Sequence, residues 1–76
     1  MRVTLRIMPP LTQYTGGKSQ VQLSLPEGTS ALQAALAAGL PAQEAGIITV
    51  RGRMVREDSP LADGDEIEIF PPIIGG

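Results

Sequence analysis

The chain has 76 residues and a mass of 8.0 kDa, which is enough for one small domain with a modest hydrophobic core. It contains no cysteine and no histidine, so we expect no disulfide, no metal and no cofactor bound by this chain. A net charge of −2 and an aromatic content of 3% argue against nucleic acid as a partner. No apolar run could span a membrane and no apolar leader opens the chain, so we expect a cytoplasmic protein without a membrane partner.

Two strands are predicted in the first third of the chain. Residues 2–8 alternate between apolar and polar side chains, and residues 19–25 repeat the pattern, so we expect an antiparallel hairpin. The loop between them contains Gly-Gly-Lys-Ser at residues 16–19, which resembles the end of a phosphate-binding loop. However, Thr12 stands where that motif needs glycine, and a strand rather than a helix follows. We therefore interpret the segment as a solvated loop.

One clear helix is predicted over residues 31–38. Ser30 and Gln33 fit a capping box, in which each side chain bonds an unpaired backbone N–H of the first turn. The segment is rich in alanine and leucine, and Gly39 is suited to end it. The apolar stripe that we expect to face the core consists of Leu32, Ala35 and Leu36.

Three further strands are predicted over residues 47–51, from residue 54 to 56, and over residues 66–70. Alternation in the last of these points Ile67 and Ile69 into the core. The element order predicts an α+β fold with one helix covering one face of a sheet.

Six acidic residues cluster over residues 57–68. Residues 59–62 interrupt the spacing that a calcium loop needs, and so small a chain offers no cleft for paired-carboxylate catalysis. We interpret the cluster as a solvated acidic surface, with a docking surface for a basic partner as the alternative.

Residues 71–76, Pro-Pro-Ile-Ile-Gly-Gly, form the most unusual segment. The prolines stiffen the exit from the last strand, and the glycines lack a Cβ and could enter a narrow slot. This layout suits presenting the α-carboxylate of Gly76 inside the active site of another protein, although a frayed end is the alternative. We therefore divide the chain into a folded domain, residues 1–70, and a flexible C-terminal tail, residues 71–76. The tail residues that would thread into a partner are Pro71, Pro72, Ile73, Ile74 and Gly75.

The last fourteen residues, Asp-Gly-Asp-Glu-Ile-Glu-Ile-Phe-Pro-Pro-Ile-Ile-Gly-Gly, resemble the ending of the MoaD/ThiS sulfur carriers. The resemblance extends over the whole chain in element order. It implies a ubiquitin-like β-grasp fold, with a mixed sheet of four to five strands and one main helix on one face. The ending looks most like that of the molybdopterin synthase small subunit. One departure is Arg51, where the family often has asparagine before the turn glycine.

The resemblance also implies a chemistry. A ubiquitin-activating-enzyme-like adenylyltransferase would use ATP to adenylate the carboxylate of Gly76, which would then become a sulfur-donating thiocarboxylate. The partner would be the molybdopterin synthase large subunit, in molybdenum or tungsten cofactor biosynthesis, or thiazole synthase in thiamine biosynthesis. The chain would be the sulfur-donating subunit of a sulfurtransferase rather than a free-standing enzyme. A ubiquitin-like modifier conjugated to lysines and a plain interaction domain remain open as alternatives.

Three apolar residues are candidates for partner docking. Strand alternation points Met8 and Phe70 outward, and the parallel pairing of first and last strands in β-grasp sheets would place them together beside the tail. The third candidate is Met54, which the resemblance places outward. The alternative is that these residues are singly exposed, as is common on protein surfaces.

Overall fold

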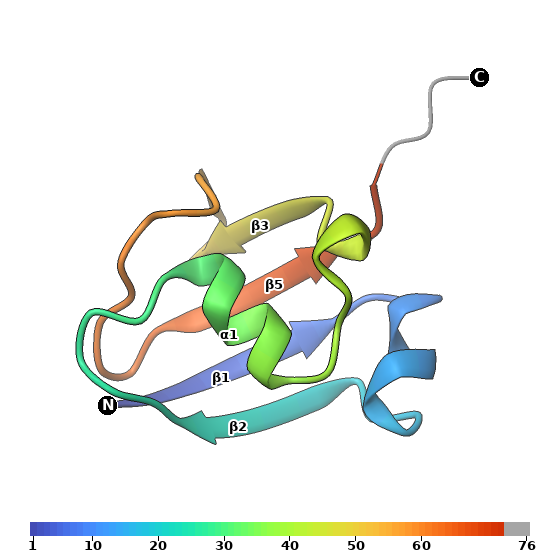
Figure 1. Ribbon diagram of the computed structural model, residues 1–76, viewed down its shortest axis with the longest axis horizontal. Helices are drawn as coiled ribbons and strands as arrows, with labels where there is room; N and C mark the ends of the chain where they lie inside the picture. Colours follow the sequence, from blue (N-terminus) through green and yellow to red (C-terminus); the bar gives the residue numbers. More distant parts are fainter. Residues whose placement is uncertain (73–76) are drawn as a thin grey trace.

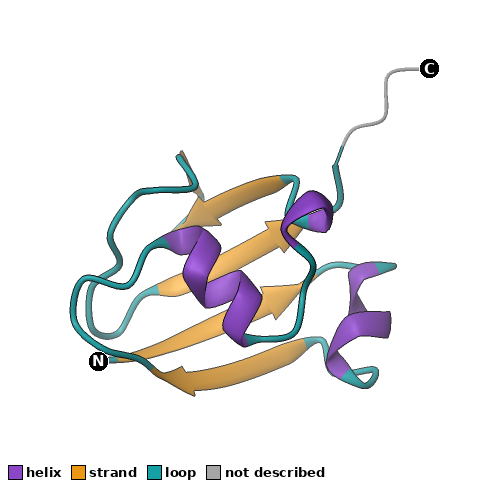
Figure 2. Ribbon diagram, in the orientation of Figure 1, coloured by secondary structure: helices purple, strands orange, loops and turns teal. Residues whose placement is uncertain are grey.

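The computed structural model describes residues 1–72 of the chain. Within these residues, five strands form one mixed sheet in the order β2-β1-β5-β3-β4, and an α-helix crosses one face of it (Figures 1 and 2). The predicted α+β architecture is confirmed. No helix of the described residues is long and apolar enough to cross a membrane.

The strands are β1 (Arg2–Ile7), β2 (Gln20–Ser24), β3 (Ile47–Val50), β4 (Arg53–Val55) and β5 (Glu66–Phe70). The helical elements are α1 (Ala31–Ala37) and two short 3-10 helices, η1 (Leu11–Thr15) and η2 (Ala42–Glu44). The predicted strand bounds differ from these by at most one residue at either end.

The strand β5 lies at the centre of the sheet. It pairs parallel with β1 and antiparallel with β3, and its inward residues Ile67 and Ile69 are fully buried, as predicted. The hairpin predicted between β1 and β2 is also confirmed. Because β1 and β5 are parallel, the N-terminus and the exit of the chain lie at opposite ends of the sheet (Figure 1).

The helix α1 begins at the predicted capping box. The hydroxyl of Ser30 accepts the backbone N–H of Gln33 at 3.2 Å, and the Gln33 side-chain oxygen accepts the backbone N–H of Ser30 at 3.0 Å. Gly39 follows the helix with a φ of 104°, and a Cβ there would lie 2.8 Å from the carbonyl oxygen of Tyr14. Glycine therefore ends this helix both for its conformation and for the close approach of η1.

The predicted apolar stripe of α1 is wrong in part. Leu36 is 46% exposed and Leu32 is only half-buried, although Ala35 is buried as predicted. The buried face consists of Ala31, Ala34 and Ala35. These methyl side chains let the helix approach the sheet closely, because the large side chains of the sheet already fill the space between the layers.

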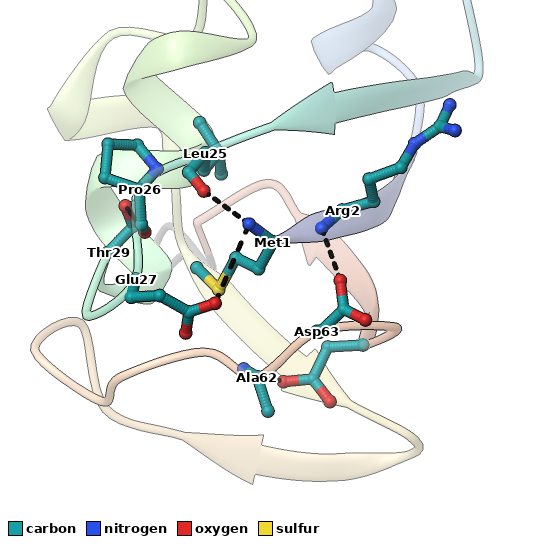
Figure 3. A network of polar contacts seen from close by, with 9 residues as sticks. Met1, Arg2, Leu25, Pro26, Glu27, Thr29, Ala62 and Asp63 are labelled. Atoms are coloured by element: carbon teal, nitrogen blue, oxygen red, sulfur yellow. Dashed lines mark hydrogen bonds and ion pairs between the residues drawn. The ribbon is translucent and has the colours of Figure 1, made fainter.

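The pole of the sheet opposite the tail is closed by hydrogen bonds around the N-terminus (Figure 3). The ammonium group of Met1 donates to the carbonyl of Leu25 at 2.8 Å, and the N–H of Arg2 donates to the carboxylate of Asp63 at 2.7 Å. Asp65 likewise accepts an N–H at 2.8 Å within the loop that precedes β5. Asp63 and Asp65 thus hold the loop that precedes β5 in place through hydrogen bonds.

Candidate functional site

The tail leaves the sheet at the end of β5. Phe70 is the last residue of the strand, and its carbonyl accepts the N–H of Gly46 at 3.0 Å. Pro71 has no N–H and cannot extend the ladder. We define Pro71 and Pro72, both half-buried, as the tail root. The predicted threading residues Ile73, Ile74 and Gly75, and the predicted reactive residue Gly76, lie outside the described residues.

Beside the tail root, three apolar residues form a row across the open face, the face of the sheet that α1 does not cover. Phe70 is the register partner of Ile47 on β3. On its other side, the N–H of Met8 donates to the carbonyl of Ile69 at 3.1 Å, which continues the β1–β5 pairing and places Met8 next to Phe70. We name Met8, Phe70 and Ile47 the apolar row; all three are half-buried.

The predicted proximity of Met8 and Phe70 is therefore confirmed, whereas Ile47 was not among the predicted docking residues. Strand alternation could have identified it, because Ile48 is buried and its neighbour must point to the other face. Ile47 closes the side of the apolar row that lies away from β1.

Met54 is 75% exposed, so its predicted outward orientation is confirmed. Its register partner is Thr49, which places it on the open face but one cross-strand row away from the apolar row. In the cross-strand row of Met54 itself, the neighbouring side chains are polar, and the Thr49 hydroxyl donates to the carboxylate of Glu68 at 3.1 Å. Met54 thus flanks the apolar row without joining it.

A shallow depression of about 240 Å³ adjoins the apolar row on the open face, lined by Arg6, Arg51, Gly52, Glu66 and Glu68. Arg6 and Glu68 are register partners, and on the open face their cross-strand row is the next one to that of Met8 and Phe70. The charges of two arginines and two glutamates cancel, so the depression offers charged groups of both signs to a partner. Among residues 1–72, no three potential metal ligands are gathered into a cluster.

An apolar strip bordered by charged residues is the arrangement found in protein–protein interfaces, where an apolar centre is surrounded by a polar rim. In this protein the apolar row lies directly beside the tail root. The open face therefore has the composition of a protein-binding surface, and the tail root lies at its edge.

The mixed sheet, the parallel terminal strands and the single covering helix define the described residues as a ubiquitin-like β-grasp domain. A profile of the ThiS family matches residues 5–76. The chain belongs to the ThiS family.

Solved structures share this fold. The small archaeal modifier protein 1 of Haloferax volcanii superposes with a TM-score of 0.78 at 19% identity, covering 95% of this chain and 98% of that one. A chain from the complex of subunits 1 and 2 of the molybdopterin-converting factor of Helicobacter pylori 26695 superposes with a TM-score of 0.64 at 25% identity, and both chains are covered completely.

A curated relative in sequence is protein RnfH of Neisseria meningitidis serogroup C. It is 34% identical over 58 residues, which make up 68% of this chain. The chain spans 63% of the length of that relative. The name of this relative points to no reaction.

Proposed function

We propose that this protein is a sulfur carrier whose C-terminal carboxylate is adenylated and then converted to a thiocarboxylate. The observation that carries the proposal is the position of the tail root beside the apolar row, on the face of the sheet that the helix leaves uncovered. Membership of the ThiS family over residues 5–76 supports it. The domain binds the partner, and the tail brings the reacting group of Gly76 to it.

The chemistry follows from the poor reactivity of a carboxylate. The Gly76 carboxylate attacks the α-phosphorus of ATP, pyrophosphate leaves, and the resulting mixed anhydride is a good acyl donor. A sulfide equivalent then displaces AMP and leaves a thiocarboxylate. If the donor is a persulfide, a thiol must reduce the acyl disulfide that forms first. ATP and its metal are bound by the activating enzyme, so this chain needs no cofactor of its own.

We propose the molybdopterin synthase large subunit as the sulfur-receiving partner. The Phe-Pro-Pro-x-x-Gly-Gly ending supports this choice, as does the full-length likeness to a chain of the H. pylori molybdopterin-converting factor complex. The apolar row would form the centre of the contact, and Met54 and the charged depression would form its border. Thiazole synthase is the alternative acceptor enzyme, consistent with the ThiS family profile.

A second candidate function is conjugation of the C-terminus to lysines of other proteins. The likeness to small archaeal modifier protein 1 favours it, although at 19% identity that likeness concerns the fold alone. Carrier and modifier begin with the same adenylate and differ only in the nucleophile that displaces AMP.

Two measurements test the proposal. Intact-mass analysis of the protein isolated from its own cells is expected to show a species with one oxygen exchanged for sulfur, whereas Gly-Gly remnants on substrate lysines would identify a modifier. In addition, deletion of Gly76, or extension by one residue, is expected to abolish pyrophosphate release by the activating enzyme while leaving the melting temperature unchanged. Normal release from the extended chain would disprove the carrier mechanism.

A further inference from the structure

Gly46 connects η2 to β3, and the tail root passes directly over it. Its N–H donates to the Phe70 carbonyl at 3.0 Å, immediately before Pro71 removes the next donor. A Cβ added to Gly46 would overlap the Cα and nitrogen of Pro72 and would lie 2.6 Å from the carbonyl carbon of Pro71. All three are backbone atoms, so no side-chain rotation could make room.

Neither backbone conformation nor burial accounts for a glycine at this position. Gly46 is not among the residues with positive φ, so a left-handed backbone is not the reason for a glycine here. It is also exposed to solvent, so the core does not require it. The close approach of two backbone segments is the constraint that only glycine satisfies.

We infer that Gly46 is a positioning residue for the tail. With no side chain at this position, the tail root rests on the backbone of Gly46, and this contact sets the direction in which the following residues leave the domain relative to the apolar row. Because proline fixes φ, Pro71 and Pro72 have only ψ free to compensate for a displacement, so we expect much of it to pass on to the residues beyond. The inference rests on the proposed function, since tail direction matters when the carboxylate must enter the active site of a partner.

The test is Gly46→Ala, assayed with the activating enzyme and ATP well below the melting temperature. The apolar row is unchanged, so we expect the KM for the carrier to stay within about 3-fold of the wild-type value, because docking is preserved. We expect kcat to fall at least ~10-fold, because displacement of a reacting group by about 1 Å is enough to slow a reaction by that much or more. A loss of fold stability alone would not lower kcat while leaving KM unchanged.

Two further variants separate tail direction from stability. Gly28 has a φ of 85°, lies in the loop between β2 and α1, and has no atom within 4 Å of an added Cβ. Gly28→Ala should therefore lower the melting temperature and leave kcat unchanged. Adding Pro72→Gly to Gly46→Ala should recover kcat at least ~3-fold over the single variant, because glycine lets the tail bend around the new methyl group.

The outcomes distinguish this inference from the proposed function. Wild-type kcat in Gly46→Ala, or an equal loss of kcat in Gly28→Ala, would overturn the inference and leave the carrier function standing. Absence of pyrophosphate release from the wild-type protein would instead refute the carrier function. The contact itself is then tested by nuclear Overhauser effects between the α-protons of Gly46 and Pro72, which are expected in the wild type and whose absence would refute the contact.

Discussion

Met8, which directly follows β1, lies side by side with Phe70 at the end of the parallel strand β5, at the pole of the sheet from which the tail leaves. They are 62 residues apart in the sequence, so the row that they share with Ile47 exists only once β1, β5 and β3 have paired. Unfolding of either terminal strand would break up the apolar row, which is the proposed docking surface. Partner binding should therefore report on the integrity of the fold.

Phe70→Glu is expected to separate binding from stability. Phe70 lies on the open face, so its replacement removes no core contact and should change the free energy of unfolding by only about 0.5 kcal/mol. It puts a charge into the apolar row, where loss of an aromatic anchor costs about 2 kcal/mol or more, equivalent to at least ~30-fold weaker binding. Thermal melts and calorimetric titration with the synthase large subunit or the activating enzyme measure the two effects.

The matched control is Ile69→Glu. Ile69 is fully buried, so this variant places an unpaired charge in the core and should unfold the domain. If Phe70→Glu unfolds the chain while Ile69→Glu is tolerated, the assignment of core and open faces is reversed.

Gly75→Val is expected to block activation far more than Ile74→Val. A branched side chain at Gly75 both widens the end of the tail and restricts its backbone angles, whereas Ile74 is already branched. Rates of adenylation at saturating ATP provide the measurement. Equal rates for the two variants would show that the glycine does not pass through a narrow channel.

Ala34→Leu is expected to destabilise the domain by about 1–3 kcal/mol, because Ala34 is fully buried where α1 meets the sheet and extra methyl groups must push the two layers apart. Leu36→Lys on the exposed side of the same helix should change stability by no more than about 0.5 kcal/mol. Chemical denaturation of both variants measures the difference. Similar losses of stability in the two variants would indicate that Leu36 faces the core.

Arg51→Asn is expected to stabilise the protein. Arg51 and Gly52 form the two-residue turn between β3 and β4, with φ values of 52° and 80°, and asparagine tolerates positive φ better than arginine does. Arg51 contacts Asp65 at 3.8 Å, but the Arg51 side chain is 67% exposed and the distance is long, so we expect the loss of this contact to cost little. We expect a gain of about 0.5–1 kcal/mol, seen as a melting temperature roughly 2–8 °C higher. A lower melting temperature would show that the ion pair outweighs the turn.

Local patterns in the sequence predicted the strands and the two faces of β5, because alternation reports burial directly where one face of a sheet is covered. For α1, the prediction of the buried face from the helical spacing of apolar residues was wrong in part. Its alanines and leucines satisfy more than one helical stripe, and the choice between them depends on how much room the sheet leaves. Only the packed layers show that Ala31 and Ala34 face inward while Leu36 does not.

Gly46 shows a second limit of sequence patterns. It lies 25 residues before Pro71, and its contact with the tail root depends on how β3 and β5 pair. No local signal marks a glycine that is needed for the close approach of a distant segment. The candidate docking residues were easier to predict, since two of them follow directly from strand alternation.

The parallel pairing of β1 and β5 has a mechanical consequence. The chain enters β1 at one pole and leaves β5 at the other, so tension applied between Met1 and the tail would pull these two strands past each other along their length. All the hydrogen bonds between them would then carry the load together in shear, rather than opening one at a time from an end. If the protein transfers sulfur through its tail as proposed, we expect this arrangement to resist unfolding when a partner pulls on the tail.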